Sequence, residues 1–280
     1  MKYNKVIKLL TAFLLLNIVV FSQKKTKKVD NERVYREFIK IGDWYNQVPF
    51  QMKLQLITRI NPAAAEQDSV ATEMTLFYGK SEFYMQAEGM EQIVNDSMVV
   101  LVNNEAKMIK LFPNNKEFQL NLEKTSMMFT PDSSFKSLIE KYTASSTQVE
   151  DNIGQIILRS RENVFGTDVP RELIKVRFIE QTRQPITFDQ SKASLIPIDT
   201  TVFNRLSKEE KYTGKLVSTT KNGVSLYFML KQQQTFCRFE KISRDVYSSP
   251  VKQEDRIVKS ENGEYRPVKE FEGYLLSKEF

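Results

Sequence analysis

The strongest constraint in the sequence is a strand-like alternation of side chains that runs from Phe50 to Leu122. Phe50, Met52 and Leu54 alternate with polar neighbours. That period of two is typical of a strand with one buried and one wet face. Short turn-like stretches separate further runs of the same kind, so the sequence predicts an antiparallel meander. The runs recur at Met74, Leu76 and Tyr78, at Phe83 and Met85, and at Phe118, Leu120 and Leu122.

Two amphipathic helices are predicted to flank this meander. The first is capped by Asp30 or Asn31 and ends before Pro49, and the second begins at Thr130-Pro131. Both have apolar residues at spacings of three and four, which place them on one face. These residues are Val34, Phe38, Ile41 and Tyr45 in the first helix, and Phe135, Leu138, Ile139 and Tyr142 in the second.

A second group of strands is predicted after residue 150. A short helix follows Asp199 and extends to about Lys211, and Asn222-Gly223 predicts a tight hairpin turn, because both residues tolerate positive φ. The strands are expected near Gly154–Arg159, Leu173–Ile179, Pro185–Phe188, Lys215–Thr219, Ser225–Leu230, Thr235–Ile242, Asp255–Lys259 and Tyr265–Leu276.

The first 30 residues are typical of an exported protein. Residues 1–22 combine a basic start with an apolar run, which predicts a cleaved signal peptide and a periplasmic or otherwise exported location. An uncleaved anchor is the alternative, because the basic tail at 23–30 opposes the usual export orientation. Residues 31–199 are then expected to form the main domain, and 200–280 a β-rich C-terminal extension or small domain.

The charge balance argues against a nucleic-acid partner. The chain has 41 lysines and arginines against 35 aspartates and glutamates. Seven of those lysines precede Val29, so the rest of the chain holds 34 cations against 35 carboxylates. Nucleic-acid binding requires clustered cations on the folded body, and the sequence has no such cluster.

Residue usage also removes several kinds of catalysis. The chain has no histidine and a single cysteine, Cys237, so nucleophile–histidine pairs, the usual zinc sites and an internal disulfide are excluded. No glycine-rich phosphate loop is present, and no metal or cofactor is expected. Paired carboxylates could cut a glycosidic bond, and the candidates are Glu88 with Glu91 and Asp96, or Glu270 with Glu272. Exposed carboxylates are the commoner situation, so we expect no enzyme activity.

The order of elements resembles the periplasmic lipoprotein-carrier superfamily (LolA-like and LolB-like proteins) over residues 31–190. Three places carry the resemblance. The helix Val34–Trp44 runs directly into the strand Phe50–Arg59. Residues 74–85 (MTLFYGKSEFYM) are followed by EQIVNDS and by Val99–Val102. The third place is GQIILR at 154–159, then 174–179 and PITF at 185–188.

This resemblance implies an α+β fold, in which a curved antiparallel sheet forms an incomplete β-barrel covered by helices, with additional C-terminal strands. In that family the sheet encloses an apolar cavity for acyl chains. Two departures stand out. The family's Asp-Gly turn reads Asp96-Ser97, and its usual Arg-Pro reads Lys80-Ser81, so an arginine that controls cargo is not carried over.

The resulting expectation is a monomeric, non-enzymatic envelope protein that binds or carries lipid or lipoprotein acyl chains. The methionine-rich meander supports this, because methionine lines adaptable apolar surfaces. The alternative is an envelope interaction or stress-sensing regulatory protein with envelope protein partners and no lipid cargo; a carboxylate hydrolase ranks last. The residues expected to line the cavity are Met52, Leu54, Leu56, Met74, Leu76, Phe83, Met85, Leu120 and Leu122.

Overall fold

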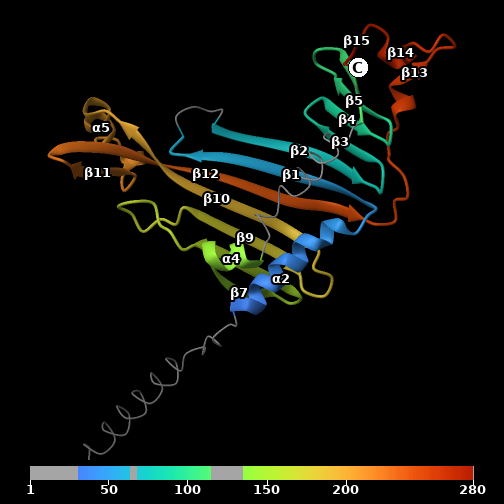
Figure 1. The fold of residues 1–280 in the computed structure, drawn as a ribbon. Coiled ribbons are helices and arrows are strands. Elements are labelled where there is room, and N and C mark those ends of the chain that lie inside the picture. The colour runs from blue at the N-terminus through green and yellow to red at the C-terminus, as the bar shows by residue number, and fades with distance from the viewer. Residues whose placement is uncertain (1–30, 64–67, 115–134, 280) are drawn as a thin grey trace, which may run out of the picture.

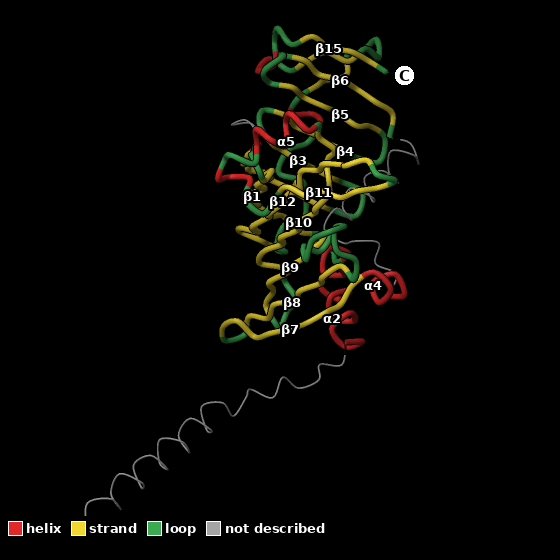
Figure 2. Tube along the Cα trace, turned by 90° about the vertical axis from the view of Figure 1, so that its left-hand side faces the viewer, coloured by secondary structure: helices red, strands yellow, loops and turns green. Residues whose placement is uncertain are grey.

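The fold is dominated by one curved, 13-stranded sheet that is almost entirely antiparallel. The computed structural model describes residues 31–63, 68–114 and 135–279. Among them the sheet does not close: its order runs β15-β6-β5-β4-β3-β2-β1-β12-β10-β9-β8-β7, with β11 paired to β12. Seen edge-on in Figure 2, the sheet is bowed, with helices α2 and α4 on its hollow side. The expected α+β class with an open, curved sheet is confirmed.

The predicted meander is confirmed through its first six strands. Each strand pairs antiparallel with the next one along the chain. Alternation gives β1 one apolar face, whereas β5 buries Val99 and Val100 on opposite faces of the sheet. The expected seventh strand at 117–122, the cap at Thr130 and residues 1–30 lie outside the described residues. The six strands are β1 (Phe50–Asn61), β2 (Ser69–Tyr78), β3 (Phe83–Ala87), β4 (Met90–Val94), β5 (Met98–Asn103) and β6 (Met108–Pro113).

Between Tyr142 and Ile198, the second strand group differs from the prediction at two points. A polar strand, β7 (Tyr142–Glu150), was not expected, and Tyr142 begins this strand instead of continuing helix α4 (Phe135–Lys141). Strand β10 (Pro185–Ile198) is also much longer than the predicted Pro185–Phe188, because it pairs with β12 along its whole length. Strands β8 (Ile153–Ser160) and β9 (Glu172–Ile179) lie close to their predicted positions.

The C-terminal segment is built into the sheet. The predicted strands Ser225–Leu230 and Thr235–Ile242 form one continuous strand, β12 (Val224–Ser243), which lies between β1 and β10. Its outer end forms the predicted hairpin with β11 (Leu216–Lys221). Residues 31–199 and 200–280 therefore share one sheet, and their division into two domains remains a proposal. The predicted strand Tyr265–Leu276 is broken, because a 3-10 turn (Lys269–Phe271) separates β14 (Tyr265–Pro267) from β15 (Leu275–Lys278).

Two hydrophobic cores lie on opposite faces of the sheet. On the hollow side, α2 (Asn31–Asp43) packs Val34, Phe38 and Ile41 against the faces of β1, β8–β10 and β12. The second core covers the other face of β2–β6 with residues from beyond Ser243, including β13 (Ile257–Lys259). Phe77 belongs to the second core while its neighbours Leu76 and Tyr78 pack on the first, as the alternation of a strand requires.

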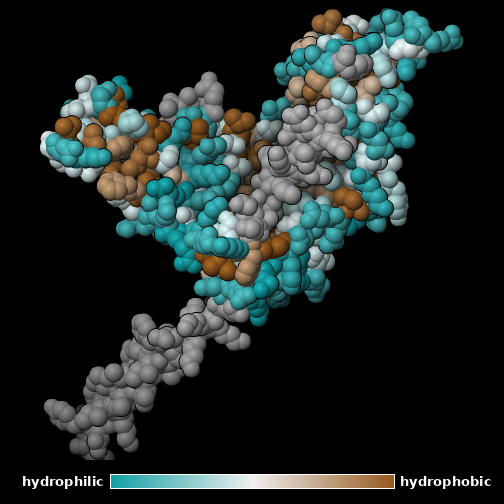
Figure 3. Space-filling model, viewed as in Figure 1, coloured by the Kyte–Doolittle hydropathy of each residue, from teal (hydrophilic) through white to brown (hydrophobic). Residues whose placement is uncertain are grey.

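A lobe projects from one end of the sheet. It contains α5 (Thr200–Leu206), a 3-10 turn (Glu210–Tyr212) and the β11–β12 hairpin. The predicted helix to Lys211 is therefore interrupted after Leu206. Asp199 caps α5, since its carboxylate accepts a hydrogen bond of 2.8 Å from the backbone N–H of Val202. Apolar surface is visible on this lobe in Figure 3.

Candidate binding face

The described cavity-lining candidates all lie on the hollow face of the sheet. Leu76 stands directly opposite both Met52 and Met85, and Leu54 stands opposite Met74. Directly paired residues point to the same face, and residues two apart on a strand do so as well. We call this set the concave strip. It consists of Met52, Leu54, Leu56, Met74, Leu76, Phe83 and Met85, while Leu120 and Leu122 lie outside the described residues.

Burial divides the concave strip into a covered part and a more open part. Met52 and Leu54 are only 1% and 2% exposed and belong to the core beneath α2. Leu56, Met74 and Leu76 are partly buried at the border of this core, and Phe83 and Met85 extend the strip beyond it. The strip therefore leaves the cover of α2 as it crosses from β1 to β3.

The space beneath the second half of α2, around Phe38 and Ile41, is filled by protein side chains. The cavity between Phe38, Ile41, Val176 and Phe188 measures only about 10 Å³. A single water molecule already requires roughly 10–15 Å³ of such volume. An acyl chain cannot enter there, so a ligand on this face would lie along the part of the strip that α2 does not cover.

Aromatic side chains close one end of the strip. Phe50 stacks on Tyr78 with a centroid distance of 5.9 Å, and Tyr78 meets the edge of Phe83 at 5.8 Å. Behind them, the Arg244 guanidinium lies 4.0 Å from the Trp44 ring centroid and donates a 2.9 Å hydrogen bond to the Trp44 carbonyl. Burial lowers the pKa of Arg244. The cation–π contact and the hydrogen bond make this end a fixed structural element.

The opposite end of the same face is polar. Beyond Leu56, strand β1 continues to Thr58, which stands opposite Thr235 of β12. Nearby, Glu172 accepts hydrogen bonds from the Tyr142 hydroxyl and from the Gln190 amide. Burial raises the pKa of Tyr142, and the hydrogen bond and charge of Glu172 raise it further. This polar group was missed because the sequence prediction ended β10 at Phe188.

Two further clefts are polar. One of about 400 Å³ lies at the start of α2. Its lining is mainly polar, with Arg33, Glu37, Arg183 and the β7 residues Ser146 to Gln148, but it also includes Val34, Ile156 and Phe178. Arg183 and Glu37 form an ion pair in it. The second, of about 240 Å³, is lined by Lys53, Glu73 and Glu88, among others. Polar linings of this kind do not suit a hydrocarbon chain, because burial of charged groups against apolar atoms is costly.

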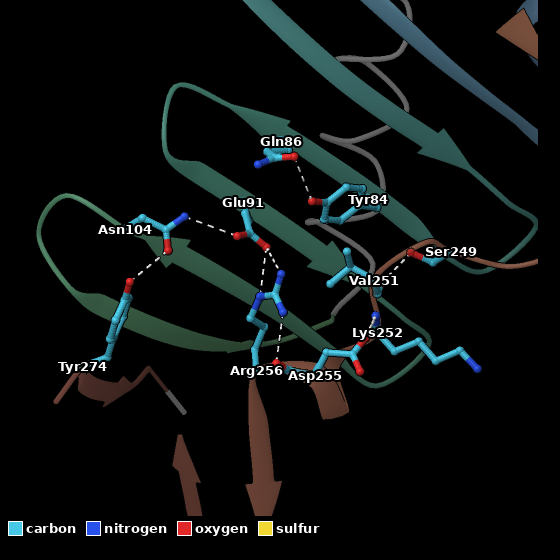
Figure 4. Close-up of polar contacts among 10 residues, drawn as sticks. All are labelled: Tyr84, Gln86, Glu91, Asn104, Ser249, Val251, Lys252, Asp255, Arg256 and Tyr274. Atoms are coloured by element: carbon cyan, nitrogen blue, oxygen red, sulfur yellow. Dashed lines mark hydrogen bonds and ion pairs between the residues drawn. The ribbon is translucent and has the colours of Figure 1, made fainter. Parts of the chain in front are cut away.

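Of the carboxylates considered for hydrolysis, Glu91 and Glu88 accept side-chain hydrogen bonds, and the other three are exposed. Glu91 accepts two hydrogen bonds from Arg256, of 2.8 and 3.0 Å, and one of 3.3 Å from Asn104 (Figure 4). Glu88 instead accepts a hydrogen bond from Thr72, and Asp96 is exposed in a turn. Glu270 and Glu272 are also exposed. Glu91 thus links β4 to Arg256 of the C-terminal segment.

The described residues contain no cluster of three or more His, Cys, Asp or Glu side chains that could hold a metal ion. None of the helices in this part of the chain has the length and apolar character of a membrane span.

Comparison with known proteins gives a distant structural likeness only. No protein-family model and no curated protein matches the sequence. Among solved structures, a DUF1329 family protein from Desulfovibrio piger matches with 8% identity and a TM-score of 0.29, covering 78% of this chain and 95% of that one. The MucA/MucB complex of Pseudomonas aeruginosa matches with 9% identity and a TM-score of 0.31, covering 78% of this chain and 59% of that one. A LolA superfamily protein from Nitrosomonas europaea matches with 8% identity and a TM-score of 0.26, covering 78% and 95%.

The superfamily that the sequence resembles is thus found again among the structural neighbours. With identities of 8–9% and TM-scores of 0.31 or less, the likeness carries no argument. Conclusions about function must therefore come from this chain's own residues.

Proposed function

We propose that this chain is a non-enzymatic, exported protein that binds an acyl chain of a lipid or lipoprotein along its concave strip. One observation carries the proposal. Leu56, Met74, Leu76, Phe83 and Met85 form a continuous apolar surface at the edge of the cover that α2 provides. The signal-like residues 1–22 support export to the envelope.

The physical basis is burial of methylene groups against adaptable side chains. Each methylene removed from water contributes about 0.8 kcal/mol, so a few contacts suffice for measurable affinity. Methionine side chains adjust their shape to such a ligand. The polar group around Glu172 and Gln190 lies at the far end of the same face. This polar group suits the hydrated headgroup of an amphiphile better than its hydrocarbon tail.

The first test is direct detection of the ligand. The folded protein is purified from the envelope without detergent and extracted with organic solvent, and the extract is examined by mass spectrometry. A fluorescent fatty acid is then titrated into the delipidated protein. We expect a co-purifying acyl lipid and saturable binding; recovery of no lipid together with no saturable binding would refute the proposal.

A variant pair locates the ligand. Leu76→Gln with Met85→Gln places two amides on the strip and should weaken fatty-acid binding about tenfold, because several methylene contacts are lost. The matched control is Val149→Gln on β7, which is 43% exposed and distant from the strip in the sheet order. Equal affinity in both variants would show that the ligand binds elsewhere.

A second function, as an interaction or regulatory protein, is supported by strand β7. It pairs only with β8 in the described sheet, and Ser145 to Glu150 are all exposed. An exposed strand edge can accept an extended segment of another protein through backbone hydrogen bonds. Lysines protect such edges in natural sheets. Ser145→Lys with Thr147→Lys should therefore abolish capture of a stoichiometric partner from envelope extracts, while fatty-acid binding is unchanged.

A further inference from the structure

The projecting lobe from Asp199 to Lys231, which we call the wing, is a well-supported structure with an exposed tip. Phe203 of α5 packs on Tyr227 of β12, with ring centroids 4.6 Å apart. Lys215 donates a 2.8 Å hydrogen bond to Asn61 at the end of β1. At the tip, Asn222 and Gly223 have φ values of 52° and 76°, which suit a two-residue turn between paired strands. The tip is therefore held out from the sheet in a defined shape (Figure 1).

One face of the wing presents apolar side chains to solvent. Val224 and Leu226 point to this face and are 60% and 37% exposed. Phe228 lies further along the same face, opposite Val217. The loop between β8 and β9 reaches this face as well, because a Cβ atom on Gly166 would lie 3.1 Å from the Val217 side chain. The neighbour of Gly166 in that loop, Phe165, is 64% exposed.

The wing also contains more cations than carboxylates. It contains six lysines and arginines and three carboxylates, whereas the whole chain has 41 against 35. Four of these cations and all three carboxylates are exposed, and Lys211 forms an ion pair with Glu209. Lys221 stands directly opposite Val224 at the tip. The exposed cations are Arg205, Lys208, Lys211 and Lys221. Of these, Lys221 shares the face of Val224. Arg205 instead lies on α5, which packs through Phe203 on Tyr227 and so on the opposite face of β12.

We propose that the wing docks this protein on the surface of an anionic bilayer. Exposed apolar side chains beside cations are the combination that binds a membrane interface: the former enter the boundary between headgroups and acyl chains, and the latter attract anionic lipid. A protein partner fits less well, because the core of a stable protein interface is depleted in charge, whereas Lys221 stands directly opposite Val224. This inference goes beyond acyl-chain binding and does not depend on it.

The test is co-sedimentation of the exported protein with lipid vesicles. Vesicles of phosphatidylcholine with phosphatidylglycerol are compared with pure phosphatidylcholine, at low and high salt. Val224→Ser with Leu226→Ser should weaken binding to the anionic vesicles about tenfold, since two apolar side chains no longer enter the interface. Lys221→Gln should weaken it about fivefold at low salt and have little effect at 1 M salt.

Val149→Ser on β7 is the matched control, because Val149 is similarly exposed but lies outside the wing. It should bind vesicles as the unmodified protein does. The wing variants should keep their melting temperature and their affinity for a fluorescent fatty acid, which separates this inference from the proposed function. Equal vesicle binding by the unmodified protein and the tip variants would overturn the inference. The inference would also be overturned if the tip variants bound vesicles normally and differed from the unmodified protein only in losing self-association, measured in the absence of vesicles.

Discussion

Replacement of Arg256 by methionine provides the sharpest test of how the second core is held together. The side chains of Arg256 and Glu91 are 15% and 6% exposed, and their closest N–O distance is 2.8 Å. Methionine keeps the apolar stem but leaves the Glu91 carboxylate buried without its cation. Removal of one partner from such a pair costs about 3–5 kcal/mol of unfolding free energy, because the remaining charge is uncompensated.

Several neighbouring contacts depend on the same guanidinium. Arg256 lies 4.8 Å from the Phe271 ring centroid, and Asn104 connects Glu91 to the Tyr274 hydroxyl through a 3.1 Å hydrogen bond (Figure 4). The Tyr84 pKa is raised by burial and by the nearby Glu91 charge, and the Arg256 charge partly offsets this. Loss of Arg256 should therefore loosen the C-terminal segment first.

The assay combines urea unfolding with hydrogen exchange. Trp44, the only tryptophan, is 3% exposed in the first core, so its fluorescence reports global unfolding. Exchange in residues 244–279 reports local release. A loss of about 3–5 kcal/mol corresponds to a melting temperature lowered by roughly 6–20 °C in a protein of this size.

Two further variants make this reasoning refutable. Arg171→Met removes an ion pair with Glu162 whose side chains are 61% and 72% exposed, and it should cost less than about 1 kcal/mol. Glu91→Leu combined with Arg256→Met should recover most of the lost stability, because no buried charge remains. If Arg256→Met lowered the unfolding free energy by less than about 1 kcal/mol, the interpretation would be wrong. It would also be wrong if the losses measured for Glu91→Leu and Arg256→Met separately added up to the loss in the double variant.

Three smaller predictions concern single side chains. Gly154→Ala should cost about 1–3 kcal/mol in urea unfolding, because its Cβ would lie 2.7 Å from the buried Phe178 ring; an unchanged midpoint would contradict this. Burial raises the pKa of the Cys237 thiol to about 12, so the folded protein should not react with a thiol reagent at pH 8. Because the unfolded thiol ionises near pH 9, unfolding free energy should fall as the pH rises from 9 towards 12, and Cys237→Ala should remove that part of the pH dependence. Asp199→Ala should cost about 1 kcal/mol through loss of the hydrogen bond to Val202, measured by urea unfolding, and an unchanged free energy would show that the cap is not needed.

The sequence alone determined the local structure wherever side-chain periodicity is strong. The alternation from Phe50 onward, with the turns between the runs, identified β1 to β6, and helical spacing identified α2. It did not predict the second core on the other face of β2–β6. The turn at Asn222-Gly223 was also predictable, because its backbone conformation depends on the residues themselves. These features need only neighbouring residues, so a single sequence contains enough information about them.

Only the tertiary structure decided how distant segments meet. Strand β7 has no apolar alternation to reveal it, and β10 extends past Phe188 because β12 pairs with it. The position of β12 between β1 and β10 joins segments that are far apart in the chain, as does the pair of Glu91 with Arg256. Such contacts arise from burial and charge pairing between surfaces whose partners are not encoded in any local pattern.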